Sequence, residues 1–391
     1  MAFINQQEPD FRVEYQNATL VSDDAGDFYI EASPEFLTEK LSKLDNGQLP
    51  VSFSPFMQAF SSMGEEGYSA FRKSIGQFSH LSKNDWPRVR RINELWLGRK
   101  LSLLAKDTAE FLSQEQFPMK NELQCLMAVR RLNLLFLQSI LDWNRFDATC
   151  ATIFGEQKKC DGAKIKQIAD LAETFDKRGT LHRLEEKSLL LVGQFVDRFN
   201  YLIPAFGLRF YKNLGQSLLE QKGITTTSFE DLKQFFVDSY ELAADLLTLV
   251  VGWNNVCYRG AWAQMAPRRK DIQTLSQFEE KSKGIRIQQF LTGAEVFDSL
   301  LHPHMDVPLR NAIAHGSYRY EGVEQRIVYY PSGREEESDR QSIYLISFAQ
   351  KCLDLFESVH SLYELLYQTR KIMLACKGQE PIPHPLGAHR K

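Results

Sequence analysis

The chain has 391 residues, a formal net charge of −3 and a hydrophobic fraction of 43%. This composition is that of an ordinary globular protein, so it excludes bulk disorder, and the near-neutral charge excludes a general positive field for nucleic acid or anionic membrane. A chain of this length is expected to hold two or three domains.

The N-terminus and the cysteines indicate the cellular compartment in which the protein is expected. The first eight residues lack the basic region and apolar run of a signal peptide, and the most apolar windows, such as 246–253, are too short to span a bilayer. The six cysteines are far apart and include no CxxC pair, which indicates buried, reduced thiols. We therefore expect a cytoplasmic protein with no membrane contact and no cofactor.

The predicted elements are mostly helical. After the first 30 residues, apolar positions recur at three- and four-residue spacing, which predicts an all-α fold. Segment 11–30 alternates weakly, which is typical of short extended pieces around a turn. Ser33 and Pro34 predict the start of a short helix that ends at Asn46 and Gly47.

Longer helical runs follow in the N-terminal half. They are predicted over 85–115, 121–154 and 180–220. Pro204 lies in the last run, where its missing N–H and its ring should kink or break the helix into two.

A polar connector at 223–227, followed by an N-capping signal at Ser228, predicts the main domain boundary. We expect a helical N-terminal region of sensing, regulatory or RNA-positioning role at 1–222, a second helical bundle at 228–376 and a flexible tail at 377–391. The bundle is predicted to contain helices over 229–262, 273–301 and 347–376. Strand-like stretches at 318–320 and 326–330 predict a small β-hairpin excursion.

The most informative segment is 309–316. Pro308 is placed to open a helix of about two turns and Gly316 to close it in a left-handed cap. His315 then lies at the C-terminal end, where the helix dipole favours the imidazolium. Arg310 precedes it by five residues, and the polar Asn311 directly follows the arginine.

This arrangement resembles the R-polar-x3-H signature of HEPN-superfamily ribonucleases. The resemblance covers about 150 C-terminal residues and rests mainly on the six at 310–315. It implies a metal-independent endoribonuclease that acts as a homodimer through its C-terminal domain, so that two motifs face each other. It also implies a setting in antiphage abortive infection or toxin–antitoxin growth control, with an antitoxin or a phage-derived trigger as a further partner.

Metal-free RNA cleavage needs few groups. The 2′-OH attacks the adjacent phosphorus, a base takes its proton and a cation stabilises the charge on the phosphoryl oxygens, leaving a 2′,3′-cyclic phosphate. We assign His315 as the acid/base, Arg310 as the transition-state clamp and Asn311 as the orienting residue, through a hydrogen bond to His315 or to a phosphate oxygen.

Candidate RNA-binding residues flank the motif. Tyr318 and Tyr320 are expected to stack on a base, with Arg319 between them; some HEPN toxins carry a tyrosine two residues after the histidine, where this chain has Ser317. Seven basic residues outnumber three acidic ones between 259 and 286, which predicts a phosphate contact unless these are solvated helix ends. The seven are Arg259, Arg268, Arg269, Lys270, Lys281, Lys283 and Arg286.

Two other clusters have simpler interpretations. Arginines at 88, 90, 91 and 99 accompany Trp86 and Trp96; such a cluster can bind single strands, but amphipathic packing is its commoner cause. His302 and His304 with Asp306 offer no fourth metal ligand, so a loop role is expected and no metal is predicted.

Two other functions remain open from the sequence. The first is a non-catalytic HEPN-like module that binds RNA or a partner protein, and the second is a helical scaffold that does neither. RNA binding without cleavage would separate the module from the enzyme.

Overall fold

A computed structural model describes residues 28–29, 31–40, 42–43, 54–266, 270–291, 296–300 and 305–382. Helices take up 69% of it and its sheets are small. The predicted all-α class with a small β excursion is therefore confirmed. None of the described helices has both the length and the apolar character needed to cross a membrane.

The described helices, in chain order, are α1 (Pro55–Asn84), α2 (Trp86–Leu97), α3 (Leu101–Thr108), α4 (Glu122–Leu137), α5 (Trp143–Lys158), α6 (Gly162–Lys177), α7 (Thr180–Gly207), α8 (Gln216–Gln221), α9 (Phe229–Arg259), α10 (Leu275–Glu279), α11 (Lys283–Leu291), α12 (Val307–His315) and α13 (Leu345–Cys376). The strands are β1 (Phe28–Tyr29), β2 (Thr38–Glu39), β3 (Ser42–Lys43), β4 (Lys222–Gly223), β5 (Tyr318–Glu321), β6 (Arg326–Tyr329) and β7 (Gln341–Tyr344). β1 pairs with β3, β2 pairs with β4, and the last three form an antiparallel sheet in the order β5-β6-β7.

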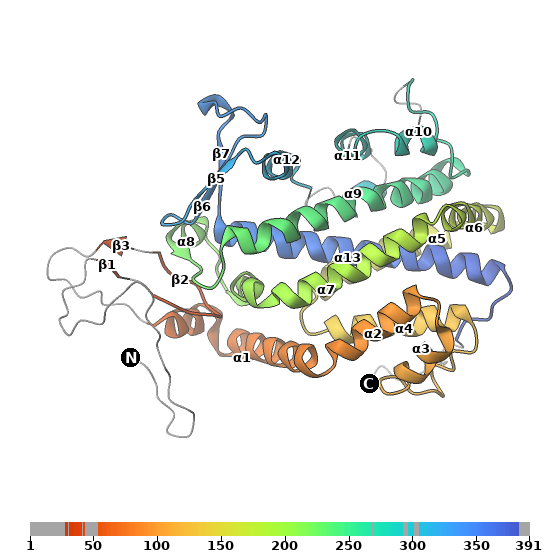
Figure 1. The fold of residues 1–391 in the computed structure, drawn as a ribbon, viewed down its shortest axis with the longest axis horizontal. Helices are drawn as coiled ribbons and strands as arrows, with labels where there is room; N and C mark the ends of the chain where they lie inside the picture. The colour runs from red at the N-terminus through yellow and green to blue at the C-terminus, as the bar shows by residue number, and fades with distance from the viewer. Residues whose placement is uncertain are drawn as a thin grey trace.

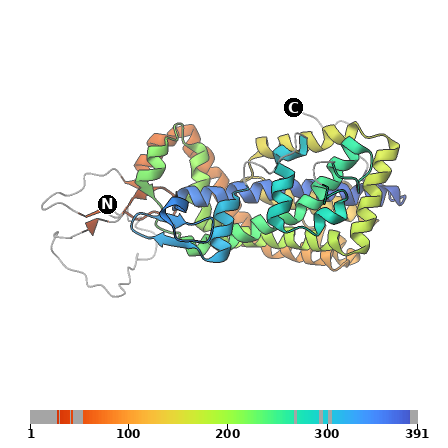
Figure 2. The ribbon, with the colours of Figure 1, turned by 90° about the horizontal axis from the view of Figure 1, so that it is seen from above.

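The last helix, α13, is the axis of the fold (Figure 1, Figure 2). It packs against α4, α5, α6, α7 and α9, and its buried residues lie on every side of the helix. A helix that is buried all round belongs to a core rather than to a surface. One hydrophobic cluster accordingly contains residues from Phe36 to Leu374, so the regions before and after 223–227 pack together. The domain division itself stays a prediction.

A buried polar stripe on α13 binds it to the N-terminal half. Glu357 accepts a hydrogen bond from Arg209 at 2.6 Å, and Glu364 accepts one from Arg130 at 2.6 Å. Both carboxylates are almost fully buried, and buried charges persist in proteins when they are paired. His360 lies on the same stripe, between the two glutamates.

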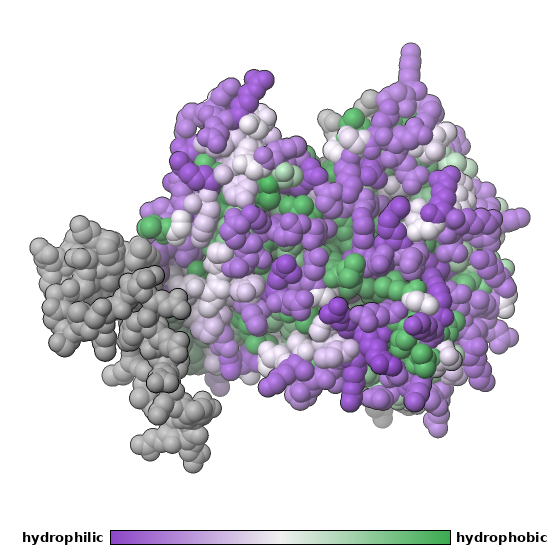
Figure 3. Space-filling model, in the orientation of Figure 1, coloured by the Kyte–Doolittle hydropathy of each residue, from purple (hydrophilic) through white to green (hydrophobic). Residues whose placement is uncertain are grey.

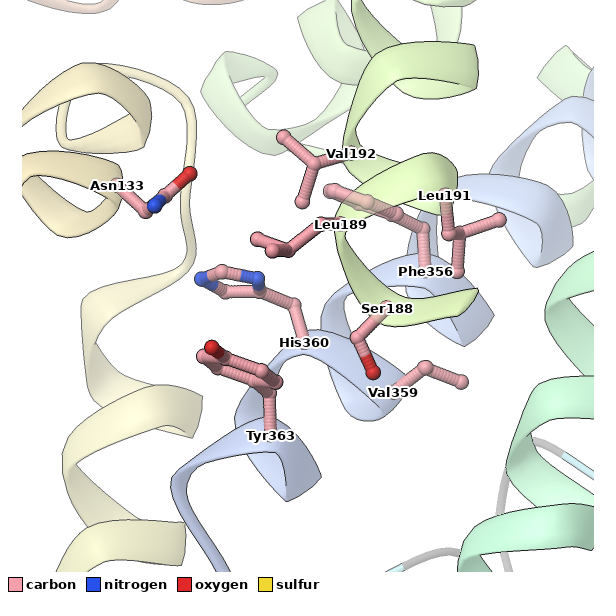
Figure 4. A pocket seen from close by; sticks show the side chains of 9 residues that line it. All are labelled: Asn133, Ser188, Leu189, Leu191, Val192, Phe356, Val359, His360 and Tyr363. Atoms are coloured by element: carbon pink, nitrogen blue, oxygen red, sulfur yellow. The ribbon is translucent and has the colours of Figure 1, made fainter. Parts of the chain in front are cut away.

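His360 faces a small cavity between α4, α7 and α13 (Figure 4). The cavity has room for about 10 Å³, which is roughly the space of one water molecule. The Nε2 atom of His360 is buried and has no hydrogen-bond partner there. Burial, followed by the nearby Arg130 charge, lowers the pKa of His360 to about 4.

Replacing His360 by phenylalanine is expected to protect the fold from acid. The histidine pKa falls from 6.5 in the unfolded chain to about 4 in the fold, so the unfolded state binds the extra proton between these values. The native chain therefore loses about 3 kcal/mol of stability through this group as the pH falls from 6.5 to about 4. The phenylalanine ring keeps the contacts with Phe146 and Phe356 and removes the titration.

Urea unfolding at a series of pH values measures this effect as the difference between the two proteins. His80→Phe, at an exposed position of α1, is the matched control and should follow the native curve. If the free energy of unfolding changed with pH in the same way for the native chain and for His360→Phe, His360 would not be held neutral in the fold.

The structure corrects the predicted helix at Ser33. Residues 34–36 form a bend, and Thr38 and Glu39 form β2. The Ser33 hydroxyl does accept a hydrogen bond from the Phe36 N–H at 3.1 Å, as a cap would. The chain then pairs with β4 instead of continuing as a helix, so a tertiary contact overrides the local signal. Residues 44–50, including the predicted stop, lie outside the described residues, as does nearly all of segment 11–30.

Four of the predicted helical runs also have different bounds. The runs at 85–115 and 121–154 are each two helices, α2 with α3 and α4 with α5. α7 continues through Pro204 and ends at Gly207. The missing proline N–H removes one helical hydrogen bond, but residues 202–207 are all buried, and their packing outweighs that loss. The run at 273–301 is not one helix but α10, α11 and a 3-10 segment at Val296–Leu300. Thr274 begins α10 with a capping box, and Ser282 accepts a bond from the Ile285 N–H at the start of α11, so capping side chains divide the run.

The predicted hairpin is present as β5 and β6, and β7 adds a third strand that the sequence analysis did not predict. The predicted cap at Ser228 is confirmed by a capping box with Asp231 at the start of α9. These two features position α12, which lies between α9 and the sheet.

Candidate functional site

The motif helix α12 has the predicted ends. The Asp306 side chain caps it by accepting a hydrogen bond from the Leu309 N–H at 3.1 Å, and Pro308 lies in its first turn. Gly316 closes it with φ of 70°, a left-handed conformation that glycine adopts without steric cost. Leu309, Ala312 and Ile313 are buried, which fixes the helix on the bundle.

Arg310 is held by a carboxylate from another helix. Its Nε donates to Oε1 of Glu241 in α9 at 3.0 Å, and its Nη2 donates to the same oxygen. The guanidinium also lies 5.7 Å from the centre of the Tyr240 ring. The arginine side chain is 23% exposed, so its direction is fixed while part of it still reaches solvent.

Glu241 belongs to a network of alternating charges that joins four helices. Lys283 in α11 pairs with Glu241 and lies 3.0 Å from Asp245, which also accepts a bond from Lys187 in α7 at 2.6 Å. Burial alone would raise the pKa of Glu241, but hydrogen bonds from Lys283 and Arg310 outweigh burial and lower it. The carboxylate therefore stays charged at neutral pH and keeps Arg310 in place.

Asn311 has a different partner from the two that the sequence analysis proposed. Its Oδ1 accepts a hydrogen bond from Nη1 of Arg310 at 3.0 Å. The amide therefore helps to orient the arginine rather than the histidine. This contact and the Glu241 contact engage all three guanidinium nitrogens of Arg310.

His315 is exposed at the last residue of α12. It lies on the helix end where the unpaired carbonyl groups carry partial negative charge. The structure thus separates the two motif residues, with a fixed arginine inside the helix and an accessible histidine at its end.

The surface around this network is hollowed. Figure 3 shows a notch between two projections, one formed by α12 and the three-stranded sheet and the other by α10 and α11. A further hollow of about 210 Å³ lies between α7 and α9, where Glu241 and Lys187 line it together with Gln194 and Asp238. A ligand in either hollow would lie close to the charges that hold Arg310.

The proposed stacking tyrosines are engaged with the bundle. Tyr318 packs edge-on against Phe229 in α9, with ring centres 4.9 Å apart, and its hydroxyl accepts a bond from Lys233 at 3.1 Å. Tyr320 lies 6.2 Å from the same ring and is half-buried, which raises its pKa. Arg319 is exposed and pairs with Glu321 at 3.0 Å. Base stacking by the tyrosines remains a prediction, and their free ring surface is small.

The described part of the basic stretch does not form a free positive patch. Lys281 pairs with Asp271 at 3.0 Å, and Lys283 belongs to the Glu241 network. Arg286 is buried and donates to Thr248 at 3.2 Å. Lys270 is exposed, and the predicted contacts Arg268 and Arg269 lie outside the described residues.

The other sequence clusters are accounted for by packing and capping. Trp86 and Trp96 lie in the core, and Arg91 and Arg99 pair with Asp107 and Glu122, which agrees with amphipathic packing. Asp306 caps α12 and pairs with Lys351 at 3.0 Å. Among the described residues there is no group of three His, Cys, Asp or Glu side chains arranged to hold a metal; His302 and His304 fall outside that part of the chain.

Glu241 is the site residue that sequence reasoning missed, and Lys283 was singled out only as part of the basic stretch, without its carboxylate partner. Glu241 lies 69 positions before Arg310, and no spacing rule links the two. The available signal was a pair of acids, Glu241 and Asp245, one turn apart in a largely apolar stretch of α9. Comparisons with protein-family models, curated protein sequences and solved structures returned no match.

Proposed function

We propose that the chain is a metal-independent endoribonuclease of HEPN type. The observation that carries the proposal is the arrangement of α12, in which Arg310 is fixed by Glu241 and Asn311 while His315 is exposed at the end of the same helix. A fixed cation and an accessible proton carrier on the same short helix are the minimal set for cleavage by an internal 2′-OH.

In the proposed reaction His315 takes the proton of the 2′-OH as this oxygen attacks the adjacent phosphorus. The 5′-oxygen leaves with a proton, and a 2′,3′-cyclic phosphate forms. Arg310 stabilises the charge on the phosphoryl oxygens, for which its guanidinium must turn N–H groups from its present acceptors toward the phosphate. A second copy of the chain, facing the first through the C-terminal bundle, supplies a second histidine for the second proton.

The setting we propose is bacterial antiphage defence by abortive infection or growth control as a toxin. In this setting, the region at 1–222 restrains or positions the nuclease until a trigger or an antitoxin acts. The packing of α7 and α9 on the shared helix α13 supports such communication, because the Glu241 network crosses from α9 to Lys187 in α7.

The chemical groups at the ends of the RNA fragments test the proposed cleavage reaction. Purified chain incubated with total RNA in EDTA should yield fragments with 2′,3′-cyclic phosphate ends, and DNA of the same sequence should stay intact because it lacks the 2′-OH. Fragments with 3′-hydroxyl ends, or equal cleavage of DNA, would point to a different chemistry.

A non-catalytic HEPN-like module that binds RNA or a protein partner is the second candidate. The observation that favours it is the engagement of Arg310 by Glu241 and Asn311, which leaves the guanidinium little freedom. A folded chain that binds RNA, and cuts none with or without its partners, would establish this module instead.

Glu241→Gln is expected to show that Glu241 positions Arg310 for cleavage and does not contribute to RNA binding. Glutamine keeps the size of the side chain and an acceptor oxygen, but it loses the charge that fixes Arg310 and Lys283. We expect kcat for RNA cleavage to fall about tenfold with KM little changed, because Arg310 would no longer be held in one direction. Steady-state kinetics on a short RNA measures the split.

Glu230→Gln is the matched control for Glu241→Gln. Glu230 lies on the same helix, is 59% exposed and pairs only with Lys233 among the ion pairs of the described residues. Its replacement should leave both constants unchanged. An equal loss in the two variants, or a rise in KM alone for Glu241→Gln, would contradict the positioning role.

A further inference from the structure

Two cysteines that are 97 residues apart in sequence meet at the end of α9. Cys160 lies in the turn between α5 and α6, and Cys257 lies in the last turn of α9. Their sulfur atoms are 4.0 Å apart, and both residues are only partly buried. The predicted burial of the thiols holds for Cys125, Cys150 and Cys352, whereas this pair is only partly buried and Cys376 is exposed.

Other contacts hold the pair together. The Cys160 thiol donates to the Glu156 carbonyl at 3.4 Å, and Lys164 Nζ donates to the Cys257 carbonyl at 2.7 Å. The first contact ties the Cys160 side chain to the end of α5, and the second binds the start of α6 to the end of α9. A disulfide has its sulfurs roughly 2.05 Å apart, so the two sulfurs need to move about 2 Å closer to bond.

We propose that Cys160 and Cys257 form a reversible disulfide when the chain meets a hydroperoxide. The Cys160 thiolate attacks one peroxide oxygen, the O–O bond breaks, and a sulfenic acid and an alcohol (water, for hydrogen peroxide) form. The Cys257 thiolate then attacks the Cys160 sulfur, the S–S bond forms and water leaves. The two thiols lose two electrons and two protons, the peroxide gains them, and a dithiol reverses the change.

The surroundings of the pair act on both thiols. Burial raises the pKa of each, and the charge of Lys164 counters part of this rise at both sulfurs. Because the sulfurs are 4.0 Å apart, the second thiol is placed to attack the first once the first is oxidised.

The disulfide would fasten α9 to the α5–α6 turn. It would close a loop of 97 residues, and long closed loops restrict the unfolded chain most. We expect the oxidised chain to melt about 5 °C or more above the reduced chain. The inference stands on the two sulfur positions alone and does not depend on the ribonuclease proposal.

The test uses the full chain carrying Cys376→Ser, which removes the exposed thiol that could cross-link two molecules. After treatment with hydrogen peroxide, we expect chains that are not covalently cross-linked to one another, each with a mass lower by about 2 Da from the two hydrogens removed. Peptide mapping should find Cys160 joined to Cys257, and a dithiol should restore the mass and the lower Tm.

The controls are Cys160→Ser and Cys257→Ser, each made in the chain that carries Cys376→Ser. Serine is close in size to cysteine but cannot form a disulfide. Each should abolish the cross-link and the rise in Tm while leaving the melting of the reduced chain nearly unchanged. The inference is overturned if both sulfurs remain open to alkylation after oxidation, if Cys160 only gains oxygen atoms, or if the mass loss persists in either variant.

Discussion

Arg370→Ala is expected to lower the free energy of unfolding by about 3–5 kcal/mol, which is a large part of the stability of a protein. Arg370 in α13 and Glu185 in α7 are each 1% exposed, and the arginine Nε donates to the glutamate at 2.7 Å. Alanine removes the main partner of a buried carboxylate and leaves a cavity beside it. The remaining cation, Arg99, lies 3.5 Å from the other carboxylate oxygen and compensates only in part.

The pH dependence of this loss has a defined sign. Burial raises the pKa of Glu185, and the charges of Arg370 and Arg99 oppose the rise. Without Arg370 the folded-state pKa rises further, so the folded variant binds a proton that the unfolded chain releases. The variant therefore loses stability as the pH rises from about 5 to about 8.

Urea unfolding at these pH values measures both effects. Arg90→Ala is the matched control, because Arg90 pairs with Glu94 on an exposed helix face, and its loss should cost under about 1 kcal/mol. The double variant Arg370→Met with Glu185→Leu should recover much of the stability, since the buried carboxylate is removed together with its cation. Asp176, which also pairs with Arg370 at 3.2 Å, is 37% exposed, and Arg99 keeps its contact with Glu122. A single variant as stable as the native chain would show that the buried pair is not needed.

His315→Ala is expected to reduce the rate of RNA cleavage by about 100- to 10,000-fold, the usual contribution of a general acid or base. Arg310→Ala should cause a loss of similar size by removing the cation. Arg310→Lys should recover little of the rate, because an ammonium cannot make the paired hydrogen bonds of a guanidinium to phosphate. Neither residue lies deep in the core, so the variants should fold like the native chain.

His182→Ala provides the matched control for His315→Ala. His182 is an exposed histidine in α7, and Arg178 precedes it by four residues, so the pair resembles the motif in composition but not in spacing. Arg178 pairs with Glu279 at 3.4 Å. Cleavage should be unchanged in this variant. A loss as large as that of His315→Ala would mean that exposed histidines affect the assay in a general way.

The parts of the fold that depend on nearby residues could be predicted from the sequence. The ends of α12 and the start of α9 follow from Pro308, Gly316 and Ser228, because a cap acts on the turn next to it. The bend at Ser33 could not be predicted in the same way, because β4 lies almost two hundred residues further along the chain. The central position of α13 could not be predicted from the sequence either, since its burial on every side depends on the helices that pack around it.

In the candidate site, too, the features set by nearby residues could be predicted and those set by distant residues could not. The spacing of Arg310, Asn311 and His315 is local, so the sequence placed them together on one short helix. The contact between Arg310 and Glu241 could not be predicted from the sequence, because it forms only through the packing of α9 against α12. Counting charges in the sequence also could not show that Lys283 and Arg286 turn toward acids and the core. The RNA contact of Lys270 and its neighbours stays a prediction.

The most direct test of the ribonuclease proposal is the rate of RNA cleavage in EDTA by the native chain and by His315→Ala, measured side by side on one labelled RNA. We expect the native chain to cut and the variant to lose at least about 100-fold in rate while still binding the RNA. Equal rates for the two proteins, or no cleavage by a folded native chain with its partners present, would contradict the proposal and favour the binding module.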